Sequence, residues 1–391
     1  MKNVLVGQSG GPTSVINSSV LGALEAALDN PSITRVFGMA HGIKGLLNDD
    51  LYDIDKEDRD ELALLRYTPS SALGSCRYKL ADPDVDDTDY KRILEIFKKY
   101  DIRYFFYNGG NDSMDTCNKI SRYMQAHDWD CRVMGVPKTI DNDLFGTDHC
   151  PGFASAAKYI ATSCMEVSKD CRVYDTGTIT VVEIMGRHAG WLAGSAALAS
   201  ACGSGPDLIY LPERPFDEAQ YLRDVQKLIE EKRGVVVVAS EGLKDKDGKP
   251  IVEPVFKVGR ATYFGDVSAH LANLVIKHLG YKARSEKPGL LGRASIALSS
   301  DVDRREAILA GEEAVRAACA GENGKMVGFI RESTSPYRAR TTLIDVNDVM
   351  LVEKKMPDEY INEAGNGVTQ AFLDWCAPLI GEPLGKLISL K

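Results

Sequence analysis

The sequence predicts an α/β protein of two Rossmann-like, three-layer lobes with mainly parallel sheets and an active site in the cleft between them. Short apolar runs alternate with longer segments of helical period, a pattern typical of parallel strands covered by helices on both faces. The 391 residues are enough to build two separate cores. Two successive strand–helix series meet near residue 152. In folds of this class, ligands bind outside the carboxyl ends of the strands.

The first lobe is expected to comprise residues 1–152 together with about 294–350, and to bind a phosphoryl donor. Its apolar runs predict strands at Lys2–Gly7, Arg35–Met39, Tyr104–Tyr107, Arg132–Val136 and Met326–Ile330. Its helical periods predict helices at Ser14–Ala27, Lys91–Lys98, Asp112–His127 and Arg304–Ala318. The acidic stretch Asp82–Asp89 is interpreted as a loop.

The second lobe is expected to comprise residues 153–293 together with about 351–391, and to bind a sugar phosphate. Strands are predicted at Thr178–Ile184, Leu208–Leu211 and Val235–Ala239. Helices are predicted at Gly152–Ser168, Gly190–Ser200, Glu218–Lys232 and Ser268–Leu279. The charged, Gly- and Pro-bearing stretch Lys244–Pro250 is interpreted as a loop.

Composition narrows the class of protein. A net charge of −9 disfavours electrostatic binding of nucleic acid or of an acidic membrane surface. No stretch approaches the roughly 20 apolar residues needed to span a bilayer, and the first residues lack the features of a signal peptide. The nine cysteines are odd in number, scattered and without a CxxC pair, so we expect reduced thiols in a cytoplasmic enzyme.

Two glycine turns each follow a predicted strand and precede a helix. The first contains Gly10 and Gly11, where backbone N–H groups and the helix N-terminus suit an anion, although a tight turn alone also favours glycine. The second contains Gly109 and Gly110, followed by Asn111 and Asp112. These two side chains offer hard oxygen ligands for Mg²⁺ held jointly with phosphate, and helix capping is the alternative interpretation. No GxxxxGK[ST] motif occurs.

The segment Thr139-Ile140-Asp141-Asn142-Asp143 follows a predicted buried strand. Two carboxylates two residues apart repel each other and contribute nothing to packing. A phosphoryl transfer needs a carboxylate to accept the proton of the attacking hydroxyl, and a second group to hold that base. We therefore interpret Asp141 as the general base and Asp143 as its partner, with an acidic turn as the alternative.

Arginines in glycine-containing turns supply candidate phosphate ligands. Arg187 follows Met185 and Gly186 at the end of a predicted strand, where a forked, permanently charged donor suits phosphate. Arg77 and Arg293 lie in similar turns, and taken singly each is equally compatible with a surface charge.

Taken in this order, the motifs resemble those of the 6-phosphofructokinase family, from the first strand to about Arg331. The similarity is carried by the Thr-Ile-Asp-Asn-Asp and Met-Gly-Arg sequences and by the Gly-Gly pair before Asn111. Within the family, the chain resembles the pyrophosphate-dependent branch. The resemblance implies reversible phosphoryl transfer from pyrophosphate to the 1-hydroxyl of fructose 6-phosphate with Mg²⁺, giving fructose 1,6-bisphosphate and phosphate in a homodimer or homotetramer.

The resemblance also implies roles for individual residues. Gly11 and Gly110 would lie against the donor, and Arg77 would bridge donor and acceptor phosphates. Contacts to the sugar are implied for Thr139, Ile140 and Asp141, with Asp141 accepting the proton. Residues implied to hold the sugar and its phosphate are Met185, Gly186, Arg187, Glu241, Arg284 and Arg293, one of the last two arginines coming from a neighbouring subunit.

Donor choice is expected to depend on Asp112 and Lys138, since ATP-dependent members resembling this chain have glycine at both positions. Asp112 would fill the space of the α-phosphate of ATP and repel it. Lys138 would offer its ammonium to the departing phosphate. Asn111 replaces a commoner aspartate at the Mg²⁺-linked position. The alternatives left open are an ATP-dependent enzyme, a regulatory subunit that binds sugar phosphate, and an acceptor such as sedoheptulose 7-phosphate.

Overall fold

The computed structural model describes residues 2–258 and 261–388, and the chain divides into two compact units. The first unit comprises Met1–Ser155 and Arg293–Lys354, and the second comprises Ala156–Gly292 and Lys355–Lys391. The chain therefore passes from one unit to the other after Ser155, Gly292 and Lys354.

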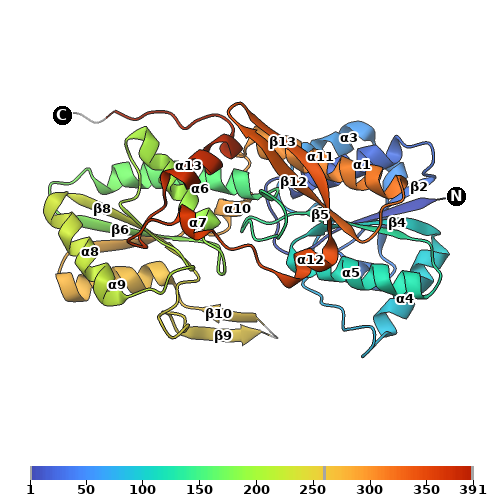
Figure 1. Ribbon diagram of the computed structural model, residues 1–391, viewed down its shortest axis with the longest axis horizontal. Helices are drawn as coiled ribbons and strands as arrows, with labels where there is room; N and C mark the ends of the chain where they lie inside the picture. Colours follow the sequence, from blue (N-terminus) through green and yellow to red (C-terminus); the bar gives the residue numbers. More distant parts are fainter. Residues whose placement is uncertain (1, 259–260, 389–391) are drawn as a thin grey trace. The chain divides into compact units, whose positions relative to one another are not determined.

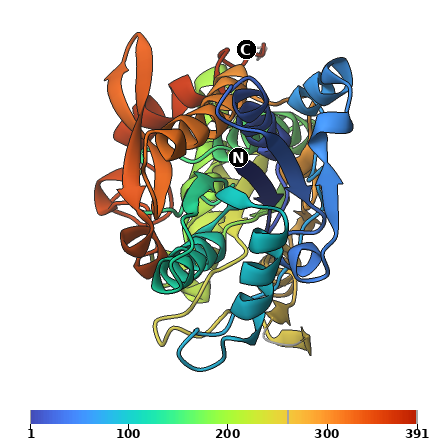
Figure 2. The ribbon, with the colours of Figure 1, turned by 90° about the vertical axis from the view of Figure 1, so that its right-hand side faces the viewer.

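The first unit is built on a seven-stranded sheet with the order β13-β12-β5-β4-β1-β2-β3. Its inner strands are parallel, while β3 and β13 pair antiparallel at the two edges. In Figure 2 this sheet runs from β13 and β12 (orange) on one side to β2 and β3 (blue) on the other. The strands span β1 Asn3–Gln8, β2 Arg35–Met39, β3 Leu51–Asp53, β4 Ile102–Gly109, β5 Arg132–Pro137, β12 Lys325–Thr334 and β13 Tyr337–Asp345.

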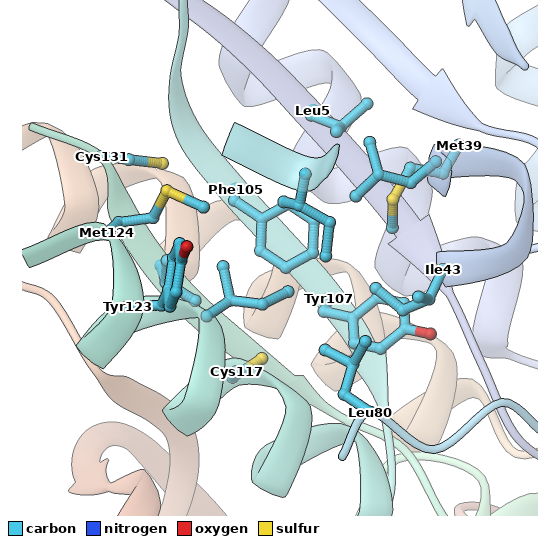
Figure 3. Close-up of a cluster of buried hydrophobic side chains, with 14 of the residues drawn as sticks. Leu5, Met39, Ile43, Leu80, Phe105, Tyr107, Cys117, Tyr123, Met124 and Cys131 are labelled. Atoms are coloured by element: carbon cyan, nitrogen blue, oxygen red, sulfur yellow. The ribbon is translucent and has the colours of Figure 1, made fainter. Parts of the chain in front are cut away.

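Helices cover both faces of this sheet because alternate residues of each strand are apolar on both sides. On β4, Phe105 and Tyr107 join one core cluster with α4 and α5, shown in Figure 3, and Tyr104 and Phe106 join the other with α1 and α11. The helices of this unit are α1 Ile16–Leu28, α2 Ile43–Leu47, α3 Arg59–Ala63, α4 Thr88–Lys99, α5 Asn111–Ala126, α11 Asp301–Cys319 and α12 Val346–Leu351. Figure 1 shows α1 and α11 on the side of the sheet opposite to α4 and α5.

The second unit contains a parallel four-stranded sheet with the order β11-β6-β8-β7. Strands β6 and β8 are buried along their whole length and are accordingly rich in the β-branched apolar residues Val and Ile. The strands span β6 Thr178–Ile184, β7 Leu208–Tyr210, β8 Gly234–Ser240 and β11 Lys282–Glu286, with a separate hairpin of β9 Pro254–Val258 and β10 Ala261–Phe264. The helices are α6 Phe153–Cys171, α7 Trp191–Ser195, α8 Glu218–Glu231, α9 Val267–Leu279 and α13 Gln370–Cys376, with the short α10 Leu291–Ala294 at the second crossing.

The α/β class with mainly parallel sheets is confirmed, and three local predictions are wrong. The helix expected over Gly190–Ser200 is a five-residue α-helix followed by a 3-10 helix; Gly194, which weakens a helix, packs there against Met356 and Phe372. The expected loop Asp82–Asp89 ends early, because α4 begins at Thr88. The strand predicted to end at Ile330 continues to Thr334, since it pairs with β13.

Several strands lack a recognisable sequence signal. Strand β11 reads Lys-Ala-Arg-Ser-Glu, and as an exposed edge strand it needs no apolar run.

Among the residues that the structure describes, no helix is both long enough and apolar enough to cross a membrane.

Candidate active site

Three predicted motifs follow the carboxyl ends of neighbouring central strands in the first unit's sheet. Strand β4 pairs in parallel with β1 on one side and with β5 on the other, so their carboxyl ends lie next to one another. The hydroxyls of Ser9 and Ser113 hydrogen-bond and so tie the two glycine turns together. The backbone N–H of Lys138 donates to the Gly109 carbonyl at 3.0 Å. The structure therefore brings both glycine turns and the lysine of the third motif together.

Lys138 is only 3 % exposed, and its Nζ donates to the Gly11 carbonyl at 2.5 Å. The pKa of Lys138 is lowered to about 8, chiefly by burial and with help from Arg293 and Arg77, whereas Asp141 and Asp143 oppose the shift. A Cβ on Gly11 would lie 2.9 Å from Nη1 of Arg293, so a side chain at Gly11 would displace that guanidinium. Three cationic side chains thus surround the first glycine turn, an arrangement that suits a highly charged anion.

The turn that carries the two predicted carboxylates is shaped by Asn142. This residue adopts a left-handed φ of 54° and is fully buried, a conformation that Asn tolerates better than most residues. Its Oδ1 accepts the Cys150 N–H at 2.9 Å, and the N–H of Asp141 donates to Thr139 Oγ1 at 3.1 Å. Thr139, Ile140, Asp141 and Asp143 are all half-buried on this turn.

Mg²⁺ ligation was predicted for Asn111 and Asp112, and that role stays a prediction; the structure adds Asp143 as a third candidate. Asn111 Nδ2 donates to Asp143 Oδ2 at 3.2 Å. Oδ1 of each residue is inaccessible to solvent and has no hydrogen-bond partner among the described residues. Two orphaned hard oxygens fit Mg²⁺. Within the described chain, no group of three or more His, Cys, Asp or Glu side chains forms a complete metal cage, so donor phosphate oxygens and water would supply the remaining ligands.

Asp112 lies in the first turn of α5, where its side chain is 87 % exposed. Its carboxylate pairs with Lys79 Nζ at 3.2 Å. This exposed lysine, 33 residues away in the sequence, partly offsets the negative charge that was expected to repel a nucleotide. Gly110, which precedes α5, has room for a ligand, since a Cβ there would meet its nearest neighbour, the Lys138 carbonyl, at 3.6 Å.

The segment that carries the exposed Arg77 is supported by the buried side-chain amides of Gln8 and Asn17. No role was predicted from the sequence for these two side chains. Gln8 Nε2 donates to Asn17 Oδ1 at 2.9 Å. Gln8 Oε1 accepts the Leu73 N–H at 2.9 Å, and Ser75 Oγ donates to the Gly10 carbonyl at 2.7 Å. The Arg77 turn is therefore fixed against the first glycine turn. The signal that could have found Gln8 is a polar residue at the end of an otherwise apolar strand.

A charged network holds the other end of the carboxylate loop. His149 is 1 % exposed; its Nδ1 contacts Asp148 at 2.9 Å and its Nε2 contacts Glu306 at 2.6 Å. Burial alone would lower the pKa of His149, but Glu306 and Asp148 raise it to about 9. Tyr337 donates to the other oxygen of Glu306 at 2.7 Å. This network ties the loop to α11 and β13.

The second unit carries the Met185–Arg187 turn at the end of β6. Its neighbour β8 supports the turn: Ser240 Oγ donates to the Gly186 carbonyl at 2.6 Å, and the Gly186 N–H meets Glu241 Oε1 at 3.4 Å. Gly186 has a φ of 119°, which a residue with a side chain would rarely adopt. Met185 is half-buried, whereas Arg187 is exposed over the Phe264 ring, 5.7 Å from its centroid. The turn thus presents a cation from a rigid base.

The two arginines predicted to grip the sugar phosphate belong to different units. Arg284 is exposed on β11, opposite Thr180 of β6 in the second unit. Arg293 belongs to the first unit, beside Gly11. Their roles remain predictions.

Several known proteins are similar to this chain in sequence and in fold. A model of the phosphofructokinase family matches residues 3–318. A Xanthomonas campestris protein named pyrophosphate–fructose 6-phosphate 1-phosphotransferase is 41% identical over 410 residues, covering 100% of this chain and 96% of its own. A Methylococcus capsulatus protein of that name is 42% identical, covering 97% of this chain and 91% of its own. The solved structure of a pyrophosphate-dependent phosphofructokinase from Nitrosospira multiformis has a TM-score of 0.90 at 39% identity, covering 99% of this chain and 94% of its own.

Proposed function

Because this chain belongs to the phosphofructokinase family, we propose that it transfers a phosphoryl group reversibly from pyrophosphate to the 1-hydroxyl of fructose 6-phosphate. The products are fructose 1,6-bisphosphate and phosphate. The observation that carries the donor assignment is Lys138, whose buried ammonium lies at the carbonyl of Gly11 within the same group of cations as Arg77 and Arg293. A compact, highly charged donor such as pyrophosphate suits this arrangement.

In the proposed reaction, the oxygen of the sugar 1-hydroxyl attacks the terminal phosphorus of pyrophosphate. Asp141 accepts the proton that this hydroxyl loses. The bond between that phosphorus and the bridging oxygen breaks, and phosphate departs. Lys138 and Arg77 stabilise the charge that develops on the departing oxygen. Mg²⁺, when bound by Asn111 and Asp143, would neutralise charge on the donor.

For the acceptor, we assign contacts to the residues for which the resemblance to the family implies them. Thr139 and Ile140 accompany the base on the carboxylate turn of the first unit. We assign binding of the sugar hydroxyls and the sugar phosphate to Met185, Gly186, Arg187, Glu241 and Arg284, and a further cation for the phosphate to Arg293.

A coupled assay with purified protein tests this function. We expect turnover with pyrophosphate and fructose 6-phosphate, loss of turnover on chelation of Mg²⁺ by EDTA, and recovery on adding the ion back. Turnover with ATP and none with pyrophosphate would overturn the donor assignment. Tight binding of fructose 6-phosphate without turnover from either donor would identify a regulatory subunit. Sedoheptulose 7-phosphate in the same panel measures acceptor breadth.

Donor selection has its own test in the double variant Asp112→Gly with Lys138→Gly. We expect pyrophosphate use to fall and ATP use to rise, since space opens and the departing-phosphate cation is lost. Unchanged pyrophosphate kinetics would contradict the assignment. We further propose that the protein is a homodimer or homotetramer, and light scattering on the purified chain would measure its size. We also propose that it is cytoplasmic, which agrees with the nine cysteines being free thiols in the structure.

A further inference from the structure

The segment 352–356 carries the chain across its third boundary between units. Lys354 is the last residue of the first unit, and Met356 lies two positions later in the second. Each of these residues is anchored within its own unit to a loop that carries residues of the proposed site. The two anchors involve side chains, Lys354 and Glu213, that take no part in the proposed chemistry.

Within the first unit, Lys354 holds the carboxylate loop by three hydrogen bonds. Its backbone N–H donates to the Asp143 carbonyl at 2.8 Å. Its Nζ donates to the carbonyls of Thr147 at 2.8 Å and Asp148 at 3.0 Å. An isolated bridge between Leu144 and Glu353 adds backbone pairing next to these bonds. Burial lowers the pKa of Lys354, because placing an ammonium away from water has a cost of desolvation.

Within the second unit, Glu213 holds the end of the Arg187 turn. Its Oε1 accepts two backbone N–H groups, from Gly190 at 2.8 Å and from Met356 at 3.0 Å. Its Oε2 is buried without a hydrogen-bond partner among the described residues, and burial raises the pKa of this carboxyl. A buried acid with an unsatisfied oxygen is costly, so its retention calls for a compensating role.

We propose that Glu213 and Lys354 are positioning residues: through the segment 352–356, Glu213 fixes the Arg187 turn for sugar-phosphate binding and Lys354 fixes the Asp141–Asp143 turn for proton transfer. The inference rests on the proposed function for the identity of the ligand. It assigns separable effects to the two side chains. Loss of the Glu213 contacts weakens acceptor binding, whereas loss of the Lys354 contacts slows the chemical step.

Isothermal titration calorimetry with fructose 6-phosphate tests the Glu213 assignment. For Glu213→Ala we expect Kd to rise about tenfold, since the hydrogen bond to the end of the turn at Gly190 is lost together with the one that joins Glu213 to Met356. Glu213→Gln keeps the accepting Oε1 and should stay within about threefold of the native Kd. Should the alanine variant not fold, Glu213→Asp carries the test, because a side chain shorter by one methylene cannot reach both N–H groups and should raise Kd.

The control variant is Asp358→Ala, which removes an exposed ion pair with Arg214 close to the same segment and should leave Kd unchanged. A native-like Kd in folded Glu213→Ala or Glu213→Asp, or a loss in Glu213→Gln as large as in Glu213→Ala, would overturn the Glu213 assignment. Failure of the native chain to bind fructose 6-phosphate would instead overturn the proposed function.

Lys354→Met removes the ammonium and keeps the length of the side chain. We expect kcat to fall by about 10- to 100-fold, because small displacements of a catalytic group are costly, while Kd for fructose 6-phosphate stays within about twofold. Turnover is measured with whichever donor supports it. An unchanged kcat, or a Kd that rises in proportion to the loss of kcat, would overturn the Lys354 assignment.

Discussion

Lys138→Met is the perturbation that bears most directly on the proposed chemistry. The substitution keeps the approximate length of the side chain and removes its charge. Lys138 is 3 % exposed and donates to the Gly11 carbonyl at 2.5 Å, so a methionine can occupy the same space. With a pKa of about 8, roughly 90 % of the native side chain is charged at pH 7.

The expected loss follows from what the ammonium does in the transition state. Removing one preorganised donor aimed at developing charge costs about 10²–10³ in kcat, and we expect kcat with pyrophosphate to fall within that range. Stability should not fall with it. Since the fold lowers the pKa of this lysine, the charged form is disfavoured in the folded state, and replacing it with an apolar group removes that cost.

The pH dependence supplies an independent measurement. Native kcat/KM for pyrophosphate should decline as pH rises through about 8, because the lysine loses its proton there. In Lys138→Met this alkaline limb should disappear. The matched control is Lys91→Met, which removes an exposed lysine paired with Asp87 on α4 and should leave both rate and profile unchanged.

Two results would refute this reasoning. A loss of kcat smaller than tenfold would show that the ammonium does not stabilise the departing phosphate. An alkaline limb that persists near pH 8 in the variant would assign that titration to another group. Steady-state assays from pH 6 to 10, with differential scanning calorimetry of each variant, provide both measurements.

Three further predictions follow from the same unit. Asp141→Asn should lower kcat by about 10²- to 10⁴-fold with KM for fructose 6-phosphate little changed, since it removes the base and keeps its shape; a matching rise in KM in the coupled assay would instead assign Asp141 to binding. Asn142→Ala should be less stable to urea than Asn142→Gly by about 1 kcal/mol, because both lose the bond to Cys150 and only alanine is strained at a φ of 54°; equal stabilities would exclude strain. The raised pKa of His149 contributes stability that is complete below about pH 6.5 and lost as pH rises through about 9, so the Tm of the native protein should decline more over this window than that of His149→Gln, and parallel declines would contradict the assignment.

Local patterns predicted much of the fold, and the reasons for the failures are physical. Buried parallel strands such as β6 and β8 are rich in Val and Ile and are recognisable from sequence. An exposed edge strand such as β11 has no such requirement and was missed. The expected helix after Gly190 became a mixed helix because tertiary contacts at Gly194 outweigh local period.

Candidate site residues divide in a similar way. The carboxylate turn and both glycine turns can be recognised from the sequence, because their candidate functional residues are adjacent along the chain. Contacts between distant residues leave no local pattern. The pairing of Lys79 with Asp112 spans 33 positions, and the bond from Gln8 to Asn17 joins a strand to a helix. Both required the three-dimensional arrangement.

The order of strands in the first unit has a consequence for synthesis on the ribosome. Strand β5 pairs with β12 on its outer side, yet β5 ends at Pro137 and β12 begins 188 residues later, at Lys325. At roughly 5–20 residues per second, the open edge of β5 waits about 10–40 s for its partner. An unpaired strand edge is a template for wrong pairing. The nascent chain therefore passes through an interval in which chaperone protection of this edge would raise the yield of native protein.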